Sequence, residues 1–132
     1  MHEAATAQAL ADLVLRKADE RNARRVLKVE LDIGELSFLE PDQLRFWLEA
    51  NFEDTIAQGA ELVINLIEPL VRCDDCDHVG RIQVEEDPAY HFMLPRFTCP
   101  RCGSARLRVE RGRESTIRRI ELELAEAPPA PR

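Results

Sequence analysis

Residues 26–36 read VLKVELDIGEL, a stretch in which apolar and charged side chains alternate up to a glycine. The alternating apolar positions are Leu27, Val29, Leu31 and Ile33. A period of two predicts a half-buried β-strand, because successive side chains of a strand point to opposite faces. Gly34 interrupts this pattern and is followed by a predicted turn.

An amphipathic helix is predicted on each side of this strand. Before it, residues 4–23 carry apolar side chains at helical spacing, namely Ala7, Leu10, Val14 and Ala18. After it, residues 40–52 place Pro41 near the first helical position. The apolar face of this second helix comprises Leu44, Trp47, Leu48 and Phe52. Both patterns predict helices with one buried stripe.

Two further strands are predicted. Residues 61–69, ELVINLIEP, place Leu62, Ile64 and Leu66 on one face. Residues 115–124 alternate through Ile120, Leu122 and Leu124 and are expected to return to the first two strands. Between residues 72 and 108 both periods fade and the cysteines appear. We therefore predict an α+β fold, a three-stranded sheet with two helices that carries an inserted zinc-ribbon-like module.

The predicted domain organisation follows from these patterns. Residues 1–71 plus 109–124 form a discontinuous α/β domain, and residues 72–108 form the metal-binding module. Residues 125–132, AEAPPAPR, are rich in proline and alanine with little to bury, which predicts a disordered tail.

Composition limits the classes of function. In 132 residues, 18 basic side chains stand against 25 acidic ones, and the net charge of −7 disfavours nucleic acid as a partner. No apolar run approaches the roughly 20 residues of a membrane-spanning helix. The N-terminus lacks the pattern of a signal peptide, so we expect a cytoplasmic protein that does not enter membranes.

Two C-x-x-C pairs, CDDC at residues 73–76 and CPRC at residues 99–102, predict a zinc site. Its ligands would be Cys73, Cys76, Cys99 and Cys102. Four thiolates leave no open coordination position, so the site is expected to be structural, and a zinc hydrolase is disfavoured. A redox dithiol and structural disulfides are the alternatives. His78 and His91 remain open as substitute ligands, and Gly103 is expected to adopt a positive φ.

The chain begins Met-His-Glu. The amine of Met1, the backbone amide of His2 and the His2 imidazole can form small chelate rings in one plane. Copper(II) and nickel(II) prefer such square-planar nitrogen donors. Glu3 adds a nearby carboxylate. The alternative is that His2 occurs there by chance and that Glu3 is favoured by the helix dipole.

Four features together resemble the HypA/HybF family of nickel metallochaperones for nickel-iron hydrogenase maturation. They are the start MHE, IGELSFLEP at residues 33–41, DTIAQGAEL at residues 54–62, and the paired cysteine motifs in this order. The resemblance implies that Met1 and His2 bind nickel(II), that Glu3 supports them, and that the four cysteines bind zinc(II). Glu40 falls where some members carry an acidic residue close to nickel; alternatively it only stabilises a helix start.

The resemblance also implies function and partners. The protein would not be an enzyme; it would exchange nickel with a HypB-like hydrogenase maturation GTPase and deliver it to the hydrogenase large-subunit precursor. A homodimer is left open. Two departures are the 22 residues between the cysteine pairs, more than in many bacterial members, and the C-terminal tail.

The rival interpretation is a zinc-ribbon adaptor that binds protein or nucleic acid and has no nickel role. In its favour, residues 96–119 hold eight arginines against Glu110 and Glu114. Such a run is usually a solvated face.

Overall fold

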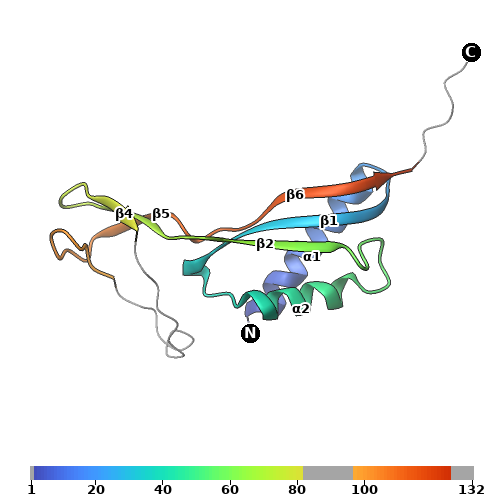
Figure 1. Ribbon diagram of the computed structural model, residues 1–132, viewed down its shortest axis with the longest axis horizontal. Helices are drawn as coiled ribbons and strands as arrows, with labels where there is room; N and C mark the ends of the chain where they lie inside the picture. Colours follow the sequence, from blue (N-terminus) through green and yellow to red (C-terminus); the bar gives the residue numbers. More distant parts are fainter. Residues whose placement is uncertain (1, 82–96, 126–132) are drawn as a thin grey trace, which may run out of the picture. The chain divides into compact units, whose positions relative to one another are not determined.

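A computed structural model of the protein describes residues 2–81 and 97–125 (Figure 1). They form two compact units. The first comprises residues 2–31, 40–64 and 116–125, and the second comprises residues 32–39, 65–81 and 97–115. The predicted domain boundaries stay a prediction, and residues 126–132 of the predicted tail lie outside the described residues. Among the described helices, none is long and apolar enough to cross a membrane.

Helix α1 (His2–Glu20) opens the first unit. Its predicted buried stripe, Ala7, Leu10, Val14 and Ala18, is confirmed. The helix includes His2 and Glu3, which we expected to precede it, and it ends before residue 23. It ends there because Asn22 has a φ of 52°, a left-handed conformation that cannot continue a right-handed helix.

Helix α2 (Pro41–Phe52) packs against α1. Pro41 takes the first helical position as predicted, and the buried side chains are Leu44, Leu48 and Phe52. The prediction for Trp47 is wrong, since its side chain is 39% exposed. The buried residues recur every four positions, which leaves Trp47 at the margin of their stripe, edge-on to the ring of Phe46.

The predicted three-stranded sheet is confirmed. Strands β1 (Ala23–Gly34), β2 (Glu61–Ile67) and β6 (Ser115–Leu124) pair in the order β2-β1-β6 (Figure 1). In the first unit, Val29 and Leu31 of the central strand are fully buried, as are Val14 of α1 and Leu44 of α2. These side chains form its core, as the α+β prediction requires.

The alternation predicted for the strands fails at three positions. Leu27 is 45% exposed and Val26 is buried instead, so the inward positions shift by one residue at the start of β1. Leu66 and Leu124 are also exposed. Both lie near the ends of β2 and β6, the two edge strands, where fewer neighbours cover a side chain.

The second unit contains a small antiparallel sheet that the sequence patterns did not predict. Its strands are β3 (Leu70–Cys73), β4 (Val79–Arg81) and β5 (Leu107–Arg111), paired in the order β4-β3-β5. In this register, Val71 of β3 lies opposite Gly80 of β4 and Val109 of β5. Strands of three to five residues are too short to show a period of two.

Three backbone segments of the second unit meet at a glycine crossing formed by Gly34, Pro69 and Gly112. A short 3-10 helix, η1 (Glu35–Ser37), follows Gly34. The carbonyl oxygen of Gly112 accepts the N–H of Leu36 at 2.8 Å. A Cβ atom on Gly34 would lie 1.9 Å from that oxygen, and one on Gly112 would lie 2.7 Å from the Cα of Pro69. Only glycine fits at these two positions.

Candidate metal centres

The first cysteine knuckle, residues 73–78, begins at the end of β3. The N–H of Cys73 donates to the carbonyl of His78 at 2.8 Å, and the N–H of Asp77 donates to the carbonyl of Cys73 at 3.0 Å. These bonds close a tight turn in which Asp77 has a φ of 59°. Aspartate tolerates this left-handed conformation better than most residues, which explains its place in the turn.

The second knuckle, residues 99–104, repeats the same hydrogen bonds. The N–H of Cys99 donates to the carbonyl of Ser104 at 2.8 Å, and the N–H of Gly103 donates to the carbonyl of Cys99, also at 2.8 Å. The φ of Gly103 is 76°, which confirms its predicted positive value. Asp77 is the equivalent residue of the first knuckle, and the sequence analysis did not single it out.

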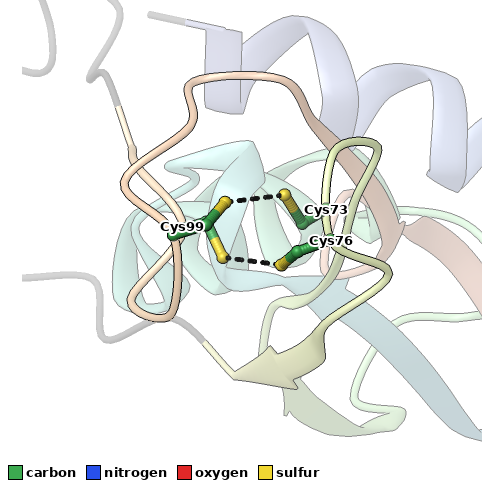
Figure 2. A group of neighbouring side chains, drawn as sticks. Cys73, Cys76 and Cys99 are labelled. Carbon is green, nitrogen blue, oxygen red and sulfur yellow. Dashed lines mark hydrogen bonds between the residues drawn. The ribbon is translucent and has the colours of Figure 1, made fainter.

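The two knuckles bring the predicted thiol ligands together (Figure 2). All four sulfur atoms, of Cys73, Cys76, Cys99 and Cys102, lie within 4.8 Å of one another. The sulfurs of Cys73 and Cys102 are 3.5 Å apart, and those of Cys76 and Cys99 are 3.7 Å apart. A tetrahedral zinc ion with Zn–S bonds of about 2.3 Å requires sulfurs about 3.8 Å apart.

This geometry fits zinc better than the alternatives. All four cysteines are free, and the two close sulfur pairs join different knuckles, whereas a C-x-x-C dithiol would pair within one. Two thiolates from each of two turns form a closed tetrahedral set. The site is therefore compatible with zinc, and its donors leave no open position for catalysis.

The thiols differ in their readiness to ionise. Burial opposes ionisation of Cys99, but hydrogen bonds from the backbone N–H groups of Cys102 and Arg101 lower its pKa to about 7. The backbone N–H of Ser104 favours the thiolate of Cys102, yet the neighbouring sulfurs, that of Cys73 first, raise its pKa to about 12. A metal ion must therefore displace protons from this cluster when it binds.

The structure places His78 outside the cluster of sulfur atoms. Within the described residues, the group of converging metal-binding side chains contains only the four cysteines. The His78 ring lies over Gly80, with Nε2 only 2.7 Å from the place of a Cβ on that glycine. His91 lies outside the described residues.

Of the residues predicted to bind nickel, His2 and Glu3 lie at the start of α1, and Glu40 lies at the start of α2. The side chain of His2 is 50% exposed, and its Nδ1 lies 3.9 Å from the carboxylate of Glu3. Glu3 is buried, and its Oε1 accepts the backbone N–H of Glu40 at 3.1 Å. The beginning of α1 is thereby tied to the beginning of α2. Met1 lies outside the described residues.

The two carboxylates of this region have structural roles of their own. Burial opposes ionisation of Glu3, but hydrogen bonds, among them the one from the Glu40 N–H, lower its pKa to about 2. Glu40 caps α2, since its side-chain oxygens accept the N–H groups of Asp42 at 3.2 Å and Gln43 at 2.7 Å. Glu3 is therefore ionised at neutral pH.

Replacing Glu3 with alanine should lower the free energy of unfolding by about 1–3 kcal/mol, because the N–H of Glu40 loses its partner in a partly buried setting. Urea unfolding of metal-free protein measures this change. Glu20→Ala is a matched control, since Glu20 is an exposed residue of the same helix with a 3.9 Å surface pair to Lys17. It should change stability by no more than about 0.5 kcal/mol. Equal effects of the two substitutions would contradict the anchoring role of Glu3.

Comparison with known proteins identifies the family. The sequence model described as "Hydrogenase/urease nickel incorporation, metallochaperone, hypA" matches residues 1–122. The chain belongs to the HypA family. HypA is a family of metallochaperones and not of enzymes, so a nickel role takes precedence over the adaptor interpretation. A role in hydrogenase maturation implies interaction with maturation machinery.

Curated HypA proteins resemble this chain over nearly their whole length. The hydrogenase maturation factor HypA of Methanopyrus kandleri is 38% identical over 134 residues, covering 94% of each chain. That of Methanothermobacter thermautotrophicus is 35% identical, covering 93% of this chain and 98% of its own. The solution structure of the nickel metallochaperone HypA from Helicobacter pylori matches with a TM-score of 0.64 at 22% identity, over 93% of this chain and 98% of that one. This last likeness supports the fold.

The arginine-rich stretch of this HypA protein is largely engaged in ion pairs. Among its described members, four lie within 4.0 Å of a carboxylate, in the pairs Arg106–Asp75, Arg108–Asp74, Arg118–Glu30 and Arg119–Glu121. Much of the local positive charge is therefore neutralised. A solvated, ion-paired face explains the run without nucleic acid.

Proposed function

We propose that this HypA protein binds nickel(II) through its first residues and delivers it to the hydrogenase large-subunit precursor. The proposed donors are the Met1 amine, the His2 backbone amide and the His2 imidazole. The observation that carries this proposal is the position of His2, whose exposed side chain sits on a helix start that Glu3 anchors from beneath. An exposed site on a fixed support can be reached by a partner protein.

The donor set suits a metal that must be handed on. Three nitrogen atoms in one plane favour nickel(II) or copper(II) over zinc. The amine, amide and imidazole must all lose protons, so affinity should fall as the solution becomes more acidic. Nickel is the cargo of this site, whereas zinc in the cysteine cluster would stay bound and maintain the fold of its unit.

The carboxylates support the site in different ways. Glu3 would position the helix start through its bond to the Glu40 N–H, and its charge would favour a bound cation. Glu40 would add a second negative charge, and direct ligation by Glu40 would require its carboxylate to leave the N–H groups of Asp42 and Gln43. We therefore place Glu3 and Glu40 in the nickel site as supporting residues.

The proposed partners are those of hydrogenase maturation. Nickel would be exchanged with a HypB-like GTPase and then passed to the large-subunit precursor in the cytoplasm. Sequential transfer requires that each partner reach the same ion, and a site at the chain start allows one partner to approach while the rest of the molecule stays folded.

Replacing His2 with alanine should weaken nickel binding by at least about 100-fold, because loss of even an outer-shell partner of a metal ligand typically costs 10- to 100-fold. Isothermal titration of untagged protein with nickel(II), with zinc already bound, measures this. Acetylating the Met1 amine should weaken binding similarly, since it removes that nitrogen as a donor while keeping every side chain.

The matched control is His78→Ala, which removes a histidine that lies outside the cysteine cluster. This variant should bind nickel as the unaltered protein does. If nickel affinity in the His2→Ala protein equals that of the control, the terminal site is wrong, and membership of the family would still hold.

A further inference from the structure

The two knuckles are joined by side chains that do not bind metal. Asp74 and Asp75 occupy the two positions between the cysteines of CDDC. Both point their carboxylates at residues 104–108, which run from the end of the second knuckle into β5. These contacts lie wholly within the second unit.

Asp75 makes the first of the two connections. One of its carboxylate oxygens accepts a hydrogen bond from the hydroxyl of Ser104, and the other lies 3.3 Å from the guanidinium of Arg106. The Ser104 hydroxyl oxygen in turn accepts the backbone N–H of Arg106 at 3.0 Å. The three residues thus form a closed ring of hydrogen bonds in which both carboxylate oxygens are used.

Asp74 forms a parallel connection one residue earlier. Its carboxylate lies 2.7 Å from Nε of Arg108, and its backbone N–H donates to the carbonyl of Arg106 at 2.9 Å. The pairing of β3 with β5 places Cys73 opposite Leu107, directly beside these contacts. We call these five residues the clasp: Asp74, Asp75, Ser104, Arg106 and Arg108. The clasp therefore extends the contacts between β3 and β5 into the two knuckles.

We propose that the clasp holds the four thiols in their binding arrangement before zinc arrives and slows the release of zinc afterwards. Asp75 is its main positioning residue, acting through Ser104 on the second knuckle. Preorganisation of this kind improves binding because the ordering cost is met in advance by the protein's own contacts.

The charges of the clasp also matter for its stability. Two aspartates beside four cysteines would repel thiolates if they were unpaired. Arg106 and Arg108 offset this repulsion. A single exposed ion pair contributes little, but the shared hydroxyl of Ser104 links the Asp75 pair into a network, for which larger effects are expected.

The clasp can be tested by the rate at which zinc leaves the full-length protein. In a stopped-flow assay with a chromophoric chelator at pH 7, Asp75→Ala and Ser104→Ala should each release zinc about fivefold faster. The double variant should be no more than slightly faster than either one, because both substitutions break the same ring.

Asp77→Asn is the matched control. It removes one negative charge next to Cys76, as Asp75→Ala does, and asparagine tolerates the left-handed conformation of this position. Within the described residues, no hydrogen bond or ion pair joins the Asp77 side chain to the second knuckle. This variant should release zinc at the unaltered rate.

A second measurement uses the metal-free protein. If the clasp acted only in the zinc complex, breaking it would change nothing in this form. Amide hydrogen exchange should show protection of the Asp74 N–H, which donates to Arg106, and loss of that protection in Asp75→Ala. Two results would overturn the proposal. One is zinc release from Asp75→Ala at the rate of the Asp77→Asn control. The other is equal exchange of the Asp74 N–H in the metal-free forms of the unaltered protein and of Asp75→Ala.

Discussion

Replacing Cys73 with serine should abolish tight zinc binding. Cys73 is fully buried and its sulfur lies 3.5 Å from that of Cys102, so the substitution removes a ligand from within the sulfur cluster. A serine hydroxyl is a poor ligand for zinc, which favours soft thiolates in such sites. We expect the affinity to fall by more than about 100-fold, beyond the typical loss for an outer-shell change.

Metal analysis after dialysis against a chelator checks this result, with one zinc per chain in the unaltered protein and almost none in the Cys73→Ser variant. The far-ultraviolet helical signal should persist, because α1 and α2 belong to the other compact unit. Retention of one zinc by Cys73→Ser would contradict a four-thiolate site.

His78→Ala and His91→Ala are the controls for this experiment, since both histidines were open as substitute ligands in the sequence. We expect both variants to keep their zinc, because the converging group in the described structure consists of cysteines. Loss of zinc in either one would show that a histidine replaces one of the four sulfurs.

The sequence predicted the elements that have a clear period. The stripe of α1 and the proline start of α2 were confirmed because twelve or more residues carry each pattern. The sulfur cluster was predictable for a different reason, since a C-x-x-C turn by itself determines where two thiols point. Leu27 was wrongly predicted to be buried. The inward positions of β1 shift by one residue near its start, and such a shift turns the side chains before it to the opposite face.

The remaining features depend on contacts between distant residues. Nothing near Glu3 in the sequence shows that its carboxylate accepts the N–H of Glu40, 37 positions away. The same holds for the clasp, where Asp75 binds Ser104, 29 positions away. Such pairs follow from the packed structure, and a charged residue taken alone is compatible with a solvated face.

Replacing Gly34 with alanine should lower the stability of the second unit by about 3 kcal/mol or more. The φ of Gly34 is −72°, a value that alanine adopts without strain, so the cost arises from collision and not from backbone preference. The added Cβ would lie 1.9 Å from the carbonyl oxygen of Gly112 and 2.5 Å from the N of Arg113. Both are backbone atoms, which cannot move aside as a side chain can.

Relief of this collision would require the crossing to open. The N–H of Gly34 donates to the carbonyl of Glu114 at 2.7 Å, and the N–H of Leu36 donates to that of Gly112 at 2.8 Å, so opening it breaks both bonds. Hydrogen exchange at Leu36 and urea unfolding should therefore change together. Urea unfolding gives the change in free energy, and hydrogen exchange at Leu36 shows that the change occurs at the crossing.

Gly59→Ala provides the comparison that separates collision from backbone strain. Gly59 has a φ of 78° and no atom within 4 Å of an added Cβ, so alanine there meets only the left-handed penalty of about 1–2 kcal/mol. Gly34→Ala should destabilise the protein clearly more, even though its backbone conformation is ordinary. If the two variants were equally stable, or Gly34→Ala the more stable, the close crossing of Gly34 and Gly112 would be wrong.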